Sequence, residues 1–238
     1  MRSLLRSQPK THPEPSTQNP EPILPTGIES LDQLLRGGLP LGTISEFTGS
    51  FSSGKTSLLF TLLAATTSEH FRVAYIDTFD TFDPHFARTA GIQLQRLLWI
   101  RCQGDSLLNK VQNSLKTADI LTRSQDFRVI VLDLEAASNE SREANVQKIP
   151  FHCWFRIKKV LQGKKVAFFL LSHNPCAGSA ATTVLGLDRS SVRWRSTRHK
   201  SHPLLSNQFQ LLRGLTTRVS LLRGRHHGHV KIHCHLQL

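Results

Sequence analysis

The chain has 238 residues, 39% of them hydrophobic, and this length suits one sizeable hydrophobic core. It contains no apolar run of the roughly 18 residues that a membrane span needs and no apolar N-terminal segment typical of a signal peptide, so we expect a cytoplasmic protein. Its four cysteines are scattered, which argues against a zinc knuckle or a disulfide framework. The formal charge of +13 favours a polyanionic partner, because basic surfaces gain affinity for nucleic acid by releasing its counterions.

The first 22 residues differ in composition from the rest of the chain. They contain five prolines among polar residues, which predicts a flexible leader that cannot bury enough apolar area to fold. From Ile23 onward, apolar runs of strand length alternate with apolar runs of helix length. We therefore expect residues 23–238 to form one α/β domain in which helices flank a mostly parallel sheet.

A glycine-rich segment follows the first long predicted strand, residues 43–48. Gly49 to Thr56 has the spacing Gly-x4-Gly-Lys-Ser/Thr, and residues 57–65 form an apolar helix directly after it. In this strand, loop and helix order, backbone N–H groups and the positive helix end surround nucleotide phosphates, the lysine reaches the outer phosphates, and the threonine holds magnesium. The predicted ATP-binding residues are Gly49, Ser50, Phe51, Ser52, Ser53, Gly54, Lys55, Thr56 and Ser57.

Further strands are predicted at residues 72–77, 97–101, 128–133 and 168–174, and an amphipathic helix at 105–122. The strand at 128–133 is apolar and ends in Asp133. An acid at this position lies beside the phosphate loop and orients the water shell of magnesium, although it could instead cap the next helix. Short β-rich runs at 183–187, 191–195, 217–222 and 230–236 predict antiparallel strands at the C-terminal edge of the sheet.

Two basic segments are candidate nucleic-acid surfaces. Residues 188–238 contain ten Lys or Arg and one acid, which favours contact with nucleic acid or phosphate over a merely solvated face. Residues 151–159 combine aromatic and basic side chains. At helical spacing this pattern favours a core face and a solvent face, with base stacking as the alternative.

Several blocks in a fixed order resemble the RecA recombinase family. They are residues 26–32 and 37–42 before the phosphate loop, residues 77–88, and the late basic segment 217–225. The resemblance covers about residues 23–238. It implies a RecA-like P-loop NTPase core with antiparallel strands at its C-terminal edge, the cofactors ATP and Mg²⁺, single-stranded DNA as a partner, and a homo-oligomer or filament.

The resemblance also implies roles for individual residues. Phe86 would stack on adenine and Asp83 would lie near its edge. His173 occupies the position of the family's γ-phosphate sensor, and histidine can still donate a hydrogen bond to phosphate. Arg223 and Arg225 match basic positions that reach the nucleotide of the neighbouring subunit, with a solvated hairpin edge as the alternative.

Departures from the family pattern qualify the expected activity. Phe79 occupies the position of the acid that activates the attacking water, and the neighbouring Asp80 would need a changed backbone to replace it. The loop at 174–181 is shorter than the recombinase DNA-binding loop, and the leader lacks a polymerisation helix. We therefore expect an ATP-binding protein of DNA repair and the SOS response with slow or absent hydrolysis. The alternatives are an ImuA-type adaptor that binds a RecA filament or a translesion polymerase, and a KaiC-like kinase.

Overall fold

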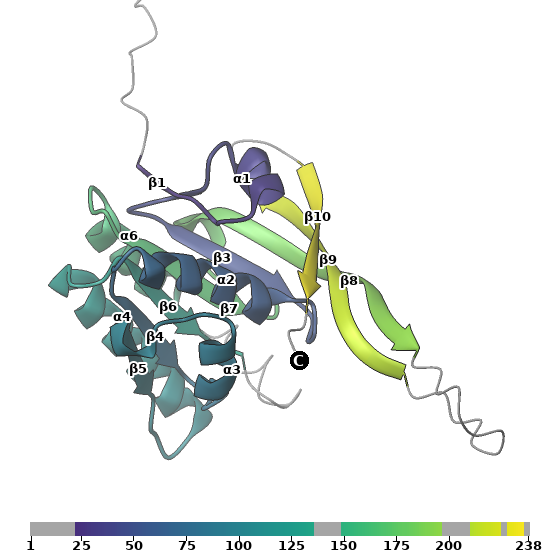
Figure 1. Cartoon of the computed structure of the whole chain (residues 1–238). Coiled ribbons are helices and arrows are strands. Elements are labelled where there is room, and N and C mark those ends of the chain that lie inside the picture. The colour runs from purple at the N-terminus through teal and green to yellow at the C-terminus, as the bar shows by residue number, and fades with distance from the viewer. Residues whose placement is uncertain (1–21, 136–148, 197–209, 225–227, 236–238) are drawn as a thin grey trace, which may run out of the picture.

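The computed structural model describes residues 22–135, 149–196, 210–224 and 228–235 (Figure 1). Within them, a central sheet of eight strands has the order β10-β9-β8-β3-β7-β6-β4-β5. From β8 to β5 all neighbours are parallel, whereas β9 is antiparallel to both β8 and β10. The strands are β3 (Ile44–Gly49), β4 (Val73–Asp77), β5 (Leu97–Arg101), β6 (Val129–Asp133), β7 (Ala167–Ser172), β8 (Ala181–Ser196), β9 (Gln210–Arg223) and β10 (Gly228–His235).

Helices cover both faces of this sheet, which explains why its central strands are continuously apolar. Leucines of α2 and residues of α1 and α3 pack on one face, and α4 and α6 pack on the other. The helices are α1 (Glu29–Leu35), α2 (Lys55–Ser68), α3 (Pro84–Thr89), α4 (Leu107–Ser124) and α6 (Phe151–Leu161), with 3₁₀ turns η1 (Leu94–Arg96) and η2 (Gly178–Ala180) and a small sheet of β1 (Ile23–Leu24) and β2 (Leu39–Pro40).

The fold class predicted from the sequence is confirmed, and the central strands lie within a residue or two of their predicted positions. One detail is wrong. Residues 183–187 and 191–195 are not two antiparallel strands but parts of the single strand β8, which is parallel to β3. The polar residues between them were interpreted as a turn. A register shift between Arg189 and Ser191 keeps β8 paired with β9 across them, as a β-bulge does.

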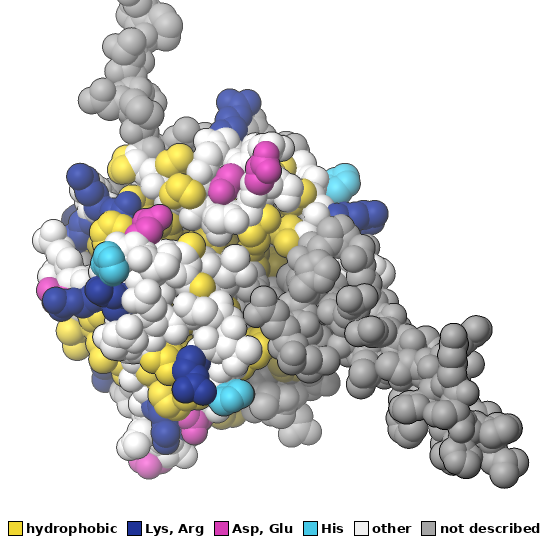
Figure 2. Space-filling view, viewed as in Figure 1, with side chains coloured by type: hydrophobic (Ala, Val, Ile, Leu, Met, Phe, Trp, Pro, Cys, Tyr) yellow, Lys and Arg dark blue, Asp and Glu magenta, His cyan; other side chains and the backbone are white. Residues whose placement is uncertain are grey.

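Basic side chains do not gather over one element on the face shown in Figure 2, where the described Lys and Arg side chains are dispersed around the rim. On this face, the described basic side chains therefore do not by themselves mark a binding surface. Among the described residues, no helix is both long enough and apolar enough to cross a membrane.

Candidate functional site

The glycine-rich loop joins β3 to α2 and adopts a conformation that requires its glycines. Gly49 has φ of 148°, and a Cβ there would lie 2.1 Å from the carbonyl oxygen of Leu187. Gly54 has φ of 94°, in the left-handed region. From β9, the Thr217 hydroxyl donates a 2.8 Å hydrogen bond to the Ser53 carbonyl, and this bond anchors the loop to the sheet. The loop is therefore held in one shape by distant parts of the chain.

The N-terminus of α2 offers donors to an anion. The helix begins at Lys55 after Gly54, which has no side chain to cap it, and its first turn contains no acidic residue. The first intrahelical bond of this end runs from Leu58 N to Gly54 O, so the preceding amides face out of the helix end. The Ser53 hydroxyl is buried without a hydrogen-bond partner among the described residues. These features fit a phosphate group.

A cleft of about 310 Å³ opens above this helix end and is lined by most of the predicted ATP-binding residues. Its walls include the whole run 50–57 together with Asp83, Phe86 and Asp133. Tyr75 and Glu135, which the sequence interpretation did not select, also line it. Segments far apart in the sequence thus meet at the carboxyl edge of the parallel strands, where open α/β sheets bind ligands.

Lys55 already has anionic and carbonyl partners in this cleft. Its ammonium group is buried, contacts the carboxylate of Glu135 and the Gly49 carbonyl, and donates to the Ser172 carbonyl at 3.3 Å. Glu135 follows Asp133 by two residues, and alternation along an extended chain places two such side chains on one side. That spacing was a signal from which Glu135 could have been predicted.

Asp133 lies at the end of β6 with both carboxylate oxygens engaged. Oδ2 accepts from the Tyr75 hydroxyl at 2.5 Å, and Oδ1 accepts from Glu135 N at 2.9 Å. Burial, reinforced by the charge of Glu135, raises the pKa of Asp133 to about 7, although the Tyr75 hydrogen bond opposes the rise. A nearby cation would stabilise the ionised form of this carboxylate. Asp133 and Thr56 both line the cleft and fit a magnesium site reached through water.

The opposite end of the cleft is aromatic. Asp83 caps α3 by accepting from His85 N at 2.8 Å and Phe86 N at 3.1 Å. This fixes the start of α3, and Phe86 keeps 38% of its surface exposed while its ring centroid lies 5.5 Å from that of Phe60. A half-exposed ring at a cleft wall suits stacking with a planar base. Asp83 and Phe86, for which the resemblance implies adenine contacts, both line the cleft.

Phe79 and Asp80 both lie outside the described lining of the cleft. Phe79 packs against the core formed with α4 and α6, whereas the cleft residues Phe60, Tyr75 and Phe82 belong to the core on the other face of the sheet. Asp80 has φ of 61° and pairs with Arg101 at 3.1 Å, with both side chains more than half exposed. Asp80 is therefore not positioned to replace a water-activating acid.

The residues predicted to sense or reach the γ-phosphate have other contacts. The carbonyl of His173 accepts from Gly49 N at 3.1 Å, and its side chain is not part of the described cleft wall. Arg223 contacts the Gly178 carbonyl and lies 3.5 Å from the Ala181 carbonyl oxygen of its own chain. Arg225 lies outside the described residues. Both contacts use Nη1, so a contact with a neighbouring subunit would use the other guanidinium donors of Arg223 or require it to leave these carbonyls.

Glu46 is a buried acid that the sequence interpretation missed. From β3, its Oε1 accepts from Cys176 N at 2.7 Å and from the Ser172 hydroxyl at 3.1 Å, and its Oε2 has no hydrogen-bond partner among the described residues. Burial beside Glu46 raises the pKa of the Cys176 thiol well above its usual value. Glu46 thus ties the strand before the phosphate loop to the loop after β7.

Comparison with known proteins agrees with the class of protein that this fold and cleft define, a P-loop α/β protein. The model of the RecA N-terminal domain matches residues 16–148, more than half of the chain. The chain therefore belongs to the RecA family. It is also similar in fold to the solved structure of the RadB recombinase, with 17% sequence identity, a TM-score of 0.62, and coverage of 90% of this chain and 96% of that one.

Proposed function

We propose that this RecA-family protein binds ATP with Mg²⁺ in the cleft above α2 and acts with single-stranded DNA in DNA repair. The observation that carries the proposal is the meeting, in one cleft, of the phosphate loop, Asp133 from β6 and Phe86 from α3. The loop suits a triphosphate, Asp133 suits a divalent cation, and Phe86 suits a planar base.

Each residue has a role that follows from its position. The amides of the loop and of the first turn of α2 hold the phosphates, and Lys55 exchanges Glu135 for a phosphate oxygen. Thr56 and the waters held by Asp133 bind Mg²⁺, which neutralises phosphate charge. Phe86 faces the adenine ring.

Stabilisation by nucleotide tests this proposal. ATP with Mg²⁺ at about 100 times its Kd should raise Tm by roughly 5–10 °C, because ligand binding to the folded state adds about 2.7 kcal/mol. Differential scanning fluorimetry with ATP, AMP and Mg²⁺ alone measures the shift. AMP lacks the β- and γ-phosphates, so an AMP shift as large as that of ATP would refute triphosphate binding.

Hydrolysis is proposed to be slow or absent, because Phe79 supplies no acid and packs on the opposite face of the sheet. We expect little phosphate release from wild type with or without single-stranded DNA, and no gain with Phe79→Glu, whose new carboxylate would not point into the cleft. Robust DNA-stimulated release by wild type would contradict this.

The same measurement addresses the second candidate, a non-enzymatic ImuA-like adaptor that binds a RecA filament or a translesion polymerase. Phe79 favours this candidate, and robust turnover would remove it. A KaiC-like kinase would instead transfer phosphate to protein. The net charge of +13 supports a nucleic-acid partner. Assembly into a homo-oligomer or filament through Arg223 and Arg225, a role in the SOS response and a cytoplasmic location remain parts of the proposal.

A further inference from the structure

The solvent face of α6 combines exposed aromatic rings with cations. The buried side of the helix is Trp154, Ile157 and Leu161, at the spacing of one helix face. The other side exposes Phe151, His152, Phe155, Arg156 and Lys159, which we call the α6 stripe. Phe151 and Phe155 are 65% and 46% exposed, although large aromatic side chains are usually among the most buried.

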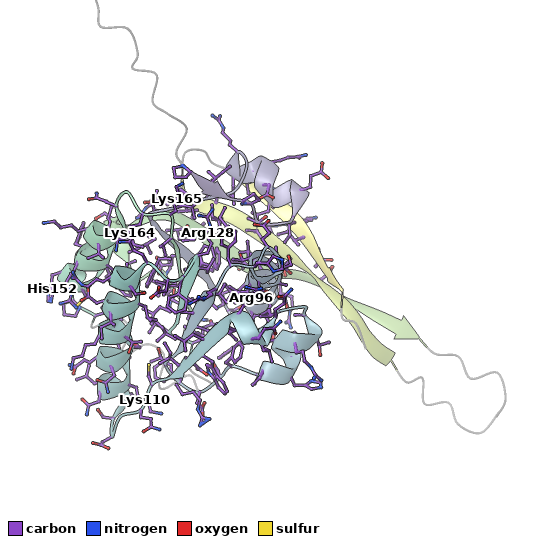
Figure 3. All side chains as sticks on the ribbon, turned by 60° about the vertical axis from the view of Figure 1, so that its left-hand side comes forward. Arg96, Lys110, Arg128, His152, Lys164 and Lys165 are labelled. Atoms are coloured by element: carbon purple, nitrogen blue, oxygen red, sulfur yellow. The ribbon has the colours of Figure 1, made fainter. Side chains whose placement is uncertain are left out.

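The charge of the α6 stripe is of one sign. The helix contains no Asp or Glu. On the adjacent α4, Asp119 is shared between Arg156, at 3.4 Å, and Arg123, at 3.2 Å, so its negative charge is already balanced. His152 lies at the outer edge of the molecule in Figure 3. A polyanion therefore meets no uncompensated negative charge on the stripe.

The stripe adjoins the loop that follows β7. A Cβ on Gly178 would lie 2.9 Å from Cε1 of Phe151, so that ring lies directly against the loop backbone. Lys158 donates from Nζ to the Ser179 carbonyl at 3.2 Å. Arg223 contacts the same loop at Gly178. The Phe151 ring is thus fixed beside a backbone segment that two cations from different elements contact.

We infer that the α6 stripe is a stacking platform for single-stranded nucleic acid, on which Phe151 and Phe155 each take one base while Arg156 and Lys159 face the phosphates. The inference rests on the proposed binding of single-stranded DNA and deepens it by naming the surface. Bases stack on exposed aromatic rings without regard to sequence, and nearby cations follow the backbone.

The spacing of the rings fits an extended strand. Four residues of helix separate Phe151 and Phe155 by about 6 Å along the axis. This exceeds the roughly 3.4 Å rise per nucleotide in one strand of B-form DNA. Neighbouring bases of a relaxed helical strand would therefore not match both rings, whereas an unstacked strand would place one base on each.

Fluorescence anisotropy of a labelled oligothymidylate tests the platform on the full chain with ATP and Mg²⁺ present. Phe151→Ala/Phe155→Ala should weaken binding at least about tenfold, because each lost stack reduces affinity on this scale. Phe151→Tyr/Phe155→Tyr keeps both rings and should bind within about threefold of wild type. Arg156→Gln/Lys159→Gln should make the slope of log affinity against log salt shallower by the contribution of about two phosphate contacts.

Phe71→Ala is the matched control, because Phe71 is also an exposed phenylalanine (40%) but packs on Arg128 at 5.0 Å and is not part of the α6 stripe. Its affinity should not change. If wild type binds and the double alanine variant binds equally well while ATP still stabilises both, the platform is refuted and the nucleotide site stands. If wild type binds no oligonucleotide, the proposed DNA binding fails together with the platform.

Discussion

Replacing Asp77 by alanine should lower the free energy of unfolding by about 3–5 kcal/mol. The Asp77 carboxylate is fully buried at the end of β4. It accepts from Thr81 N at 2.9 Å, Phe82 N at 3.1 Å and Trp99 Nε1 at 3.1 Å. Alanine leaves these donors without their acceptor, and donors bonded to a charged group lose the most. Urea unfolding followed by tryptophan fluorescence measures the change.

Asp80→Asn is the control for that prediction, because asparagine removes the charge and still tolerates the φ of 61° at this position. Asp80 lies three residues away, is 59% exposed and pairs only at the surface with Arg101. Its removal should change stability by less than about 0.5 kcal/mol. The turn that Asp77 holds also positions Phe82, whose ring centroid lies 4.6 Å from that of Tyr75 at the cleft. Equal stability of the two variants would show that Asp77 does not anchor this turn.

Lys55→Ala should weaken ATP affinity about 100-fold or more, which corresponds to a loss of roughly 3 kcal/mol. Lys55 is the buried cation at the phosphate end of the cleft, with 3% of its side chain exposed. Without it, the triphosphate would face Asp133 and Glu135 with no ammonium group to balance their charge. Titration with a fluorescent ATP analogue in the presence of Mg²⁺ measures the affinity.

Two further variants separate this effect from a general loss of folding. Lys164→Ala also removes a half-buried lysine, whose Nζ donates to the Thr122 carbonyl at 2.6 Å. Because Lys164 lies outside the described cleft wall, this variant should bind ATP normally. Glu135→Gln removes the carboxylate that competes for Lys55 and should bind ATP at least as tightly as wild type. Equal ATP affinity of wild type and Lys55→Ala would refute the proposal that ATP binds in this cleft.

Local sequence patterns were sufficient to predict the fold and the phosphate loop. The central strands are buried on both faces, so each appears as an uninterrupted apolar run, as in residues 129–133. The loop is recognisable because its glycines are required by backbone geometry at Gly49 and Gly54. The order of such blocks also indicated the RecA family, which the match to the N-terminal domain model confirms.

Features set by contacts between distant segments were not predicted. Thr217 braces the loop because β9 passes behind it, and Glu46 holds the segment after β7 because β3 lies between β7 and β8. The face on which Phe79 packs depends on the turn that Asp77 organises. Each depends on strand register or on a turn within the assembled sheet, which a single sequence does not reveal.

A crystal structure with a non-hydrolysable ATP analogue and Mg²⁺ would test the central claim most directly. The account predicts the triphosphate over the N-terminus of α2, Lys55 turned from Glu135 to a phosphate oxygen, the metal between Thr56 and Asp133, and the adenine beside Phe86. A nucleotide bound elsewhere, or one with its phosphates away from residues 49–57, would contradict it.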